Sequence, residues 1–364
     1  MKRNLCIFTV LAWTPGVWGS ALPRAQYRVA TVAGSSQLGD GGPAISAQIG
    51  AIQGIAVDRG GNLYLADTDH HRVRRIAPDG AIATLAGTGT AGYSGDGGPA
   101  AGAQLNLPYG LAADLAGNVY VADLGNNRVR RIGPDGTITT VAGTGVQGSS
   151  GDGGPATGAQ LLAPRNVAAD AAGNLYISEF GGHRVRKVSP DGRIVTVAGT
   201  GVAGFRGDGG AAASAQLAFP AGLAVDRNGA LYIADSQNQR VRKVMPGGLI
   251  ATVLGGTPGT KLLTPMAVAP DLSGGLYVAD GSGTVRAATT SGGWINVAGN
   301  GTPGFSGDSG PAPSAALTVP RDLALDSAGN LYIADGVRIR RVDGSGTIQT
   351  VAGDGYLQAI GDGG

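Results

Sequence analysis

The chain contains 364 residues, of which 42% are hydrophobic and 14% charged, with 67 glycines and a formal net charge of +2. This apolar content can fill a large core, which excludes a disordered chain, and the near-neutral charge argues against a nucleic-acid-binding protein. The glycine content fits many tight turns and does not fit a helical protein. We therefore expect a β-rich fold.

The first 21 residues have the three-part pattern of a secretory signal peptide. Lys2 and Arg3 form a basic start, residues 5–13 form an apolar run too short to cross a bilayer, and residues 19–21 form a small-residue cleavage site. The alternative is a buried N-terminal strand. We expect cleavage near Ala21, export to the extracellular space or the periplasm, and no later segment that crosses a membrane.

Cleavage changes the expected composition in two ways. The single cysteine, Cys6, leaves with the signal peptide, so the mature chain has no disulfide and no cysteine-bound metal. Loss of Lys2 and Arg3 leaves 25 basic and 25 acidic side chains and a net charge of zero. We therefore expect no nucleic-acid partner.

Residues 117–143 contain the unit from which the rest of the chain is built. Three short runs rich in Tyr, Val, Ile and Thr are separated by Leu-Gly-Asn-Asn and Gly-Pro-Asp-Gly, which predicts three antiparallel strands. A further apolar run, residues 110–114, precedes them, so one unit has four strands, named a to d in chain order. A tyrosine in strand b marks six copies, mostly about 56 residues apart: Tyr64, Tyr120, Tyr176, Tyr232, Tyr277 and Tyr332.

Four-stranded units at this interval predict an all-β fold, a six-bladed β-propeller of four-stranded antiparallel blades. We expect a single propeller domain over residues 22–364. A β-helix would need much shorter repeats. In a propeller, neighbouring blades cover both faces of each sheet, which explains why residues 63–66 are apolar without alternation.

The meander predicts which loops share an end of the ring. The a–b and c–d turns lie at one end, and the b–c loops and the linkers from strand d to the next strand a lie at the other end, which we call the linker face. The linkers repeat a Gly-Asp-Gly-Gly-Pro-Ala phrase, clearest in residues 93–108 and 149–164. Its oxygens suit Ca²⁺, but one Asp per loop favours a simple turn, with Asp96 capping a short helical turn at Pro99. We expect no cofactor.

The fifth linker and the two chain ends depart from the pattern. Residues 255–265 lack the phrase, and Thr284 stands where the other copies carry the first arginine of strand c. Residues 28–34 and 347–353 both read as a strand d and compete for the outer edge of the sixth blade. The sequence leaves open which of them closes the ring.

The blades resemble NHL repeats. The residues that carry the resemblance recur in the first two copies, at 61–67, 71–76, 78–80, 117–123, 127–132 and 134–136. The likeness covers residues 27–364 and extends to exported bacterial NHL-repeat proteins and to the NHL portion of large cell-surface adhesion proteins. It implies a propeller used mostly to bind proteins or other ligands, although some related six-bladed propellers are lactonases or lyases.

Acidic residues that end strand b and arginines in strand c recur in the copies. We expect Asp67 to pair with Arg72, and the equivalent residues likewise, in an ion pair that pins the b–c loop. A second arginine, Arg74 in the first copy, is present in all six copies. Because both series recur blade after blade, their expected role is structural. His71 and His183 are expected to be exposed loop residues that are too far apart for a zinc site.

Candidate ligand-binding residues lie where the copies disagree, near the start of strand a at the channel mouth of the linker face. Copies three and six carry polar pairs there and face each other across a six-fold ring. The candidate residues are Gln53, Tyr109, Arg165, Asn166, Arg321 and Asp322. Two arginines at this mouth indicate an anionic group on a ligand. The alternative is a water-filled channel lined by Arg–Asp salt bridges.

Together these features favour an exported, non-catalytic, monomeric propeller that binds a protein or glycan partner through its linker face. The alternative is a lyase or lactonase-like enzyme with its site at the channel mouth. With three histidines and a single glutamate, Glu179, neither type of metal site is easily assembled, so we assign no catalytic residue and no metal ligand. Neutral charge and export disfavour RNA binding, which some NHL proteins show.

Overall fold

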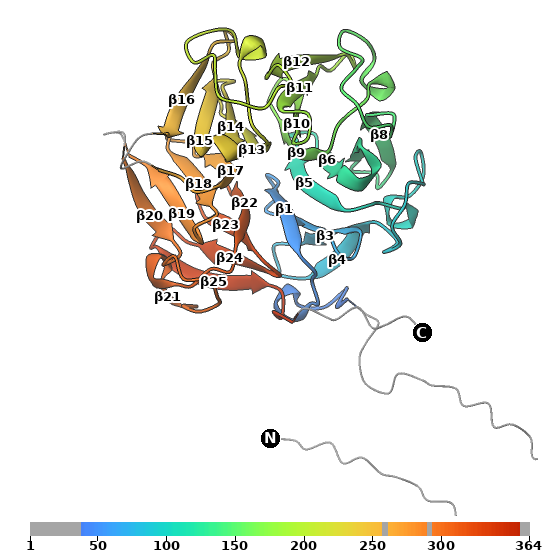
Figure 1. The fold of residues 1–364 in the computed structure, drawn as a ribbon. Coiled ribbons are helices and arrows are strands. Elements are labelled where there is room, and N and C mark those ends of the chain that lie inside the picture. The colour runs from blue at the N-terminus through green and yellow to red at the C-terminus, as the bar shows by residue number, and fades with distance from the viewer. Residues whose placement is uncertain (1–37, 257–260, 290–292, 357–364) are drawn as a thin grey trace, which may run out of the picture. The chain divides into compact units, whose positions relative to one another are not determined.

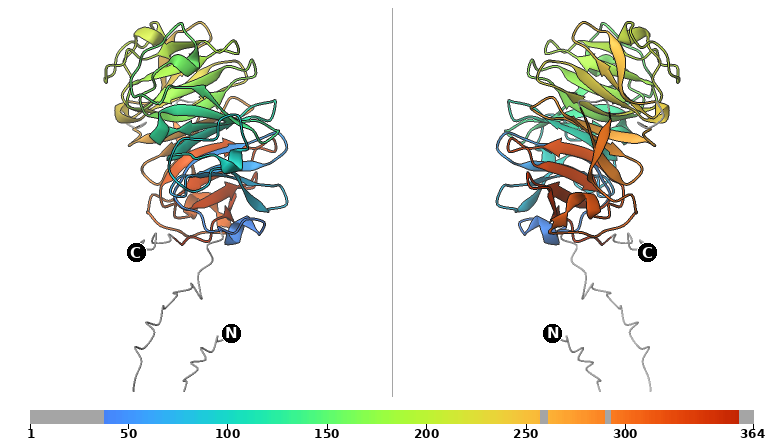
Figure 2. Two further views of the ribbon diagram at one scale, coloured as in Figure 1. Left: turned by 90° about the vertical axis from the view of Figure 1, so that its right-hand side faces the viewer. Right: turned by 90° about the vertical axis from the view of Figure 1, so that its left-hand side faces the viewer.

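The computed structural model describes residues 38–256, 261–289 and 293–356, which form six antiparallel sheets around a central axis (Figure 1). The innermost strands of consecutive sheets are in contact, and the last sheet meets the first. Two side views show the loops gathered at the two ends of the ring (Figure 2). The predicted six-bladed propeller of four-stranded blades is confirmed. In the described part of the chain, no helix is long and apolar enough to cross a membrane.

The strands of the first three blades are β1 (Ile52–Val57), β2 (Leu63–Asp67), β3 (Arg72–Ile76) and β4 (Ile82–Ala86); β5 (Pro108–Ala113), β6 (Val119–Asp123), β7 (Arg128–Ile132) and β8 (Ile138–Ala142); and β9 (Pro164–Ala169), β10 (Leu175–Glu179), β11 (Arg184–Val188) and β12 (Ile194–Ala198). Those of the last three blades are β13 (Pro220–Val225), β14 (Leu231–Asp235), β15 (Arg240–Val244) and β16 (Ile250–Gly255); β17 (Pro265–Pro270), β18 (Leu276–Asp280), β19 (Thr284–Ala288) and β20 (Trp294–Ala298); and β22 (Pro320–Leu325), β23 (Leu331–Asp335), β24 (Arg338–Val342) and β25 (Thr347–Ala352).

The connections contain short 3₁₀ turns and one very short strand. The turns are η1 (Ala44–Ser46), η2 (Ala100–Gly102), η3 (Leu124–Asn126), η4 (Ala156–Gly158), η5 (Ala212–Ser214), η6 (Ser236–Asn238) and η7 (Ala312–Ser314). The strand, β21 (Gly310–Pro311), pairs with the outer edge of β25. Other linkers make the same contact as a single bridge, such as Pro99 with Thr137, so the sixth blade follows the common plan.

The apolar core lies between neighbouring blades. Val121 of β6 packs in one cluster with Ala66 and Val73 of blade one, and Ile177 of β10 packs in another with Val129 of β7. Each sheet is therefore covered on both faces. This explains why all five residues of β2 are buried, without the alternation of a strand that has one face in water.

Each linker crosses the seam between two blades. At the end of β4, the Gly87 N–H donates to the Ala100 carbonyl (3.0 Å), while the Ala100 N–H donates to the Gly136 carbonyl before β8 (2.8 Å). Both parts of this linker also contact the b–c loop of blade two: Asn126 Nδ2 donates to the Gly92 carbonyl (2.7 Å), and the Gly125 N–H donates to the Asn106 carbonyl (2.9 Å). The predicted helical turn after Pro99 is present as η2, but no side chain caps it.

The seam between blades six and one is closed in the same way. The Gly353 N–H donates to the Ala44 carbonyl (2.9 Å), and the Ala44 N–H donates to the Gly80 carbonyl (2.9 Å). Residues 347–352 form β25, the outer strand of blade six next to β24. The competing segment, residues 28–34, lies outside the described residues.

Buried arginines join the linkers to the blades. Arg130 of β7 has a fully buried side chain, and its guanidinium contacts the carboxylates of Asp96 (2.7 Å), in the linker phrase, and Asp123 (3.5 Å), at the end of β6. Four other blades repeat this double contact through Arg74, Arg186, Arg242 and Arg340. Asp96 thus pairs with an arginine and does not cap η2. The repeated Gly-Asp-Gly-Gly phrase therefore provides a carboxylate for a buried guanidinium.

The predicted pairing of Asp67 with the first arginine of strand c is wrong. Arg72 donates to the backbone carbonyls of His70 (3.3 Å) and Thr88 (2.7 Å). The carboxylate of Asp67 contacts Arg74 (3.3 Å), because this arginine points into the seam. The predicted structural role of the second arginine series is confirmed.

Blade five keeps only part of this arrangement. Its linker lacks the phrase, and Arg286 contacts a single carboxylate among the described residues, that of Asp280 at 3.8 Å. The Arg286 side chain is 20% exposed and lies over the Trp294 ring, 4.3 Å from its centroid. Nη1 donates to the Lys261 carbonyl (3.1 Å). Other blades make the same carbonyl contact, as between Arg130 Nη1 and the Gln104 carbonyl (3.4 Å), so what blade five lacks among the described residues is the second carboxylate.

Candidate functional site

The inner strands approach each other closely near the linker face. A Cβ on Gly54 would lie 2.2 Å from the carbonyl oxygen of Tyr109 in the next blade, and a Cβ on Gly110 would lie 2.5 Å from the Cα of Asn166. A side chain does not fit at such distances, so Gly54 and Gly110 must be glycine for blades one and two to approach their neighbours in this way. Asn166 and Asp322 occupy the equivalent position in blades three and six.

Asn166 and Asp322 use their side chains to bond the next blade. Asn166 Oδ1 accepts the Leu223 N–H (3.2 Å), and Asp322 Oδ2 accepts the Ile55 N–H (2.9 Å) across the closing seam. Both residues are buried, with 7% and 6% of their surfaces exposed. Burial raises the pKa of Asp322 to about 7, against the opposing effects of the Ile55 and Leu323 N–H groups and of the Arg165 charge. These two residues hold blades together as well as lining the mouth region.

Arg165 occupies the mouth itself. Its guanidinium carbon lies 4.6 Å from the Phe180 ring centroid and 5.2 Å from that of Tyr109, and Nη2 lies 3.9 Å from the sulfur of Met266. Burial lowers the pKa of Arg165, and the nearby charge of Arg321 lowers it further, whereas Tyr109 and Asp322 act in the opposite direction. Charges from blade six, those of Arg321 and Asp322, thus act on Arg165 of blade three.

Tyr109, Arg321 and Asp322 each act on Arg165, whereas the predicted residue Gln53 is not among the groups that do. Gln53, in β1, is partly buried, and its Oε1 has no hydrogen-bond partner among the described residues. Gln53 is the one candidate residue from blade one, and its side-chain oxygen is free to accept a hydrogen bond.

The sequence prediction missed an aromatic cluster beside Arg165. The Phe180 and Phe219 rings are 5.0 Å apart, and Phe219 contacts His183 edge-on at 4.5 Å. Phe180 lies in the b–c loop of blade three, where the equivalent residues Thr68 and Ser236 donate to prolines of the next blade. The sequence signal is that copy three carries Phe180 where copies one and four carry a hydroxyl residue.

The histidines, expected to be exposed loop residues, bond the next blade. His183 Nδ1 accepts the Phe219 N–H (3.2 Å), and His71 Nδ1 accepts the Leu107 N–H (3.2 Å). Accepting these bonds requires the neutral imidazole, and burial lowers the pKa of both histidines. Both are part of the contacts that hold the blades together.

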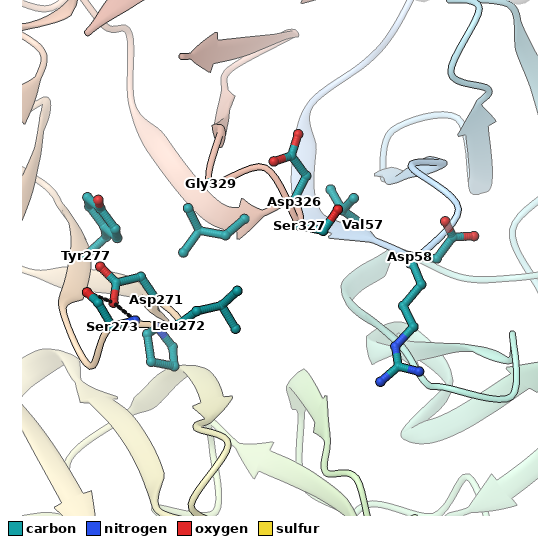
Figure 3. Close-up of a pocket in the computed structure, with 12 residues that line it drawn as sticks. Val57, Asp58, Asp271, Leu272, Ser273, Tyr277, Asp326, Ser327 and Gly329 are labelled. Carbon is teal, nitrogen blue, oxygen red and sulfur yellow. Dashed lines mark hydrogen bonds between the residues drawn. The ribbon is translucent and has the colours of Figure 1, made fainter. Parts of the chain in front are cut away.

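A pocket that the sequence did not predict opens at the opposite end of the ring. It has a volume of about 590 Å³ and lies among the a–b turns of blades five, six and one (Figure 3). Val57, Leu272 and Leu325 give it apolar walls, and Asp58, Arg59, Asp271 and Asp326 stand at its edge. Its shape depends on side-chain sizes in three blades, which no single repeat encodes.

The pocket carboxylates are largely engaged in their own turns. Asp58 accepts bonds from Asn62 and from the Tyr64 hydroxyl (2.9 Å), and Asp326 accepts from Asn330. In blade five, Gly275 stands where the other two turns have the asparagine. Burial opposes ionisation of these carboxyls, but the hydrogen bonds they accept lower their pKa. The described residues include no group of three or more His, Cys, Asp or Glu that could hold a metal ion.

Comparisons with known families and proteins agree with the repeat pattern. A family model for the teneurin NHL domain matches residues 203–260 and 287–361, and one for the NHL repeat matches residues 52–76. The chain is 31% identical over 238 residues to Teneurin-1 of Mus musculus, covering 57% of this chain and 8% of the relative. It is 28% identical over 261 residues to Protein SUPPRESSOR OF QUENCHING 1, chloroplastic, of Arabidopsis thaliana, covering 53% of this chain and 24% of the relative. The chain thus spans at most 24% of the length of these two relatives, and its resemblance to NHL repeats is confirmed.

Solved structures share the fold at low identity. A catalytically inactive virginiamycin B lyase from Staphylococcus aureus with quinupristin has a TM-score of 0.53 at 16% identity, covering 85% of this chain and 86% of that one. A gluconolactonase from Xanthomonas campestris has a TM-score of 0.56 at 15% identity, with coverage of 84% and 88%. A chain of a nidogen/laminin complex has a TM-score of 0.53 at 14% identity, with coverage of 78% and 88%. These likenesses show the fold alone.

Proposed function

We propose that this chain is an exported, non-catalytic NHL propeller that binds a partner protein through its linker face. Residues 1–21 are then a cleaved leader, and residues 22–364 a single monomeric propeller domain. The resemblance to NHL repeats supports a binding role, because it implies propellers used mostly to bind proteins or other ligands. A glycan partner is the alternative that the experiment distinguishes.

The observation that carries this proposal is a set of exposed apolar side chains in the first halves of the linkers. Tyr93, Phe205 and Phe305 are 40%, 41% and 45% exposed, and they belong to the linkers that lead into blades two, four and six. Val146 and Val202 are 58% and 59% exposed in the linkers before blades three and four. Large apolar side chains that recur on one end of a molecule mark an interaction surface.

The three aromatic rings are held in place by arginines. Each ring lies over the guanidinium that opens strand c of the following blade, which limits its motion before a partner binds. Aromatic and arginine side chains are also the types enriched at the centres of protein interfaces. The distances from guanidinium carbon to ring centroid are 3.6 Å for Arg128 and Tyr93, 3.5 Å for Arg240 and Phe205, and 3.8 Å for Arg338 and Phe305.

The test is capture of a partner from the surroundings of the exporting cell by the full chain and by two matched variants. One variant replaces Tyr93, Phe205 and Phe305 by serine. The control replaces Leu115 and Leu272 by serine, which are 54% and 68% exposed at the a–b turn end. We expect one protein to bind the wild type and the control but not the triple variant, with purified components repeating the result.

Other outcomes separate the alternatives. Capture that is lost after the sample is treated with glycosidases would assign the surface to a glycan. Equal capture by the triple variant and the control would contradict the proposed surface. Stoichiometric Ca²⁺ or Zn²⁺ that is lost on substitution of Arg321 and Asp322, together with lactone or lyase turnover, would contradict the non-catalytic role.

A further inference from the structure

The channel mouth holds two arginines, Arg165 and Arg321, that form no salt bridge with the residues that the structure describes. In the described residues, no carboxylate oxygen lies within 4.0 Å of a guanidinium nitrogen of Arg165 or Arg321. By contrast, five buried arginines of the blades each have two carboxylates within this distance. The only polar contact of the Arg165 guanidinium in this part of the chain is the Met266 sulfur, 3.9 Å away. A guanidinium has five N–H donors, so most of those of Arg165 are free to bind a ligand.

The carboxylate that acts on the charge of Arg165 is engaged by the backbone. Asp322 acts on the charge of Arg165, but its Oδ2 accepts the Ile55 N–H (2.9 Å) and its Oδ1 accepts the Leu323 N–H (3.0 Å). The two arginines also repel each other, since the charge of Arg321 lowers the pKa of Arg165. An anion placed between them would relieve that repulsion and fill the empty donors.

The walls of the mouth are apolar. Phe180 and Tyr109 lie beside the Arg165 guanidinium, at 4.6 and 5.2 Å from ring centroid to guanidinium carbon, and Met266 is 9% exposed. Phe219 extends this surface from blade four, 5.0 Å from Phe180. Such walls favour a ligand whose charged end is carried on an apolar stem.

We infer that the mouth of the linker face binds a carboxylate on an apolar or aromatic stem, held by Arg165 and Arg321 and packed against Tyr109 and Phe180. A planar carboxylate matches the paired donors of a guanidinium, which lysine could not offer. Within the proposed function, the carboxylate is presented by the protein partner. The site itself does not depend on that partner, so a small molecule can test it separately.

The probe is phenylacetate, with phenylacetamide as its neutral match, titrated into the full mature chain and followed by ligand-observed NMR and calorimetry. We expect phenylacetate to bind at least ten-fold more tightly than the amide. Arg165→Met and Arg321→Met should each lower the affinity for phenylacetate ten-fold or more. Arg75→Met removes an exposed arginine of β3 and should change nothing. Arg165→Lys keeps the charge without the planar donors and should recover only part of the affinity.

Two results would overturn the inference. One is equal binding of phenylacetate and phenylacetamide. The other is a loss of affinity in Arg75→Met as large as in the mouth variants. Glucuronate binding more tightly than phenylacetate would also contradict the apolar stem and point to an acidic sugar. Arg165 packs against two rings, so its replacement could also destabilise the fold. Unfolding curves of each variant, together with the Arg321→Met variant, distinguish a folding defect from a lost ligand contact. If the mouth does not bind phenylacetate, the proposed partner surface of Tyr93, Phe205 and Phe305 is unaffected, because it uses other residues.

Discussion

Arg130 and Arg165 belong to neighbouring blades, yet their surroundings are opposite. The side chain of Arg130 is fully buried, with the carboxylates of Asp96 and Asp123 at 2.7 and 3.5 Å. Arg165 is partly buried against Phe180, Tyr109 and Met266 and has no carboxylate at such a distance in the described chain. In five blades the ring thus neutralises the second arginine of strand c, whereas the described residues place no carboxylate at salt-bridge distance from Arg165. The arginine that recurs in every copy helps to hold the blades together, whereas the residues at the mouth differ from copy to copy.

The largest effect is expected when one of the neutralised arginines is removed. Arg130→Met leaves Asp123 buried without its cation, which costs about 3–5 kcal/mol of the free energy of unfolding. Burial raises the pKa of Asp123 to about 6, so this carboxyl can take up a proton, and the loss should be smaller at pH 5 than at pH 8. Urea unfolding followed by circular dichroism at both pH values measures this. A loss below about 1 kcal/mol at pH 8 would show that the pair is dispensable.

Asp322 allows a second test, because it joins blades in the manner of Asn166. Its pKa of about 7 lies above the ordinary value, so the folded chain binds this proton more tightly than the unfolded chain. The stabilisation of the folded state by this tighter proton binding is therefore complete below about pH 4 and is lost as the pH rises toward 7. Asp322→Asn can still accept the Ile55 N–H and cannot ionise, so it should be more stable than the wild type by on the order of 2 kcal/mol at pH 8.

The difference between Asp322→Asn and the wild type should shrink as the pH is lowered to 4. Denaturant unfolding of both proteins at pH 4, 6 and 8 gives the profile. A difference that stays constant with pH would mean that Asp322 does not titrate in this range, and the account of its burial would then be wrong.

Blade five should respond least to loss of its arginine. Arg286 is 20% exposed and has one carboxylate, at 3.8 Å, among the described residues. Arg286→Met therefore leaves less buried charge without a partner than Arg130→Met does. It should lower the free energy of unfolding by about 1 kcal/mol. The same unfolding measurement compares the two variants directly. Equal losses would indicate that the second carboxylate of the other blades adds nothing.

The fold could be predicted from the sequence because each blade repeats its own turns and apolar runs. Tyr64 and its equivalents fix the number of blades, and continuous burial on both faces follows from that number. The partner of Asp67 could not be predicted in the same way. Arg72 is nearer along the chain, but Arg74 points into the seam that Asp67 and the linker carboxylate of Asp40 share. Which of the two arginines pairs with Asp67 depends on which face of strand c points into the seam between the packed blades.

The candidate site was only partly predictable for the same reason. A six-fold ring predicts that blades three and six face each other, and the charges of Arg321 and Asp322 act on Arg165; a ligand site formed by these residues stays a prediction. The sequence could not show that Asp322 turns toward Ile55, since this bond forms between chain segments that meet only when the ring closes. The pocket at the a–b turns depends on side chains from three blades and leaves no mark in any one repeat.

The most direct test of the difference between the two kinds of arginine is the free energy of unfolding of Arg165→Met, measured beside Arg130→Met in the same buffer at pH 7.5. If the mouth arginine is kept for a ligand, Arg165→Met should stay within about 1 kcal/mol of the wild type, because it loses ring contacts but no ion pair. A loss as large as that of Arg130→Met would contradict the account, since Arg165 would then be one more residue that holds the ring together.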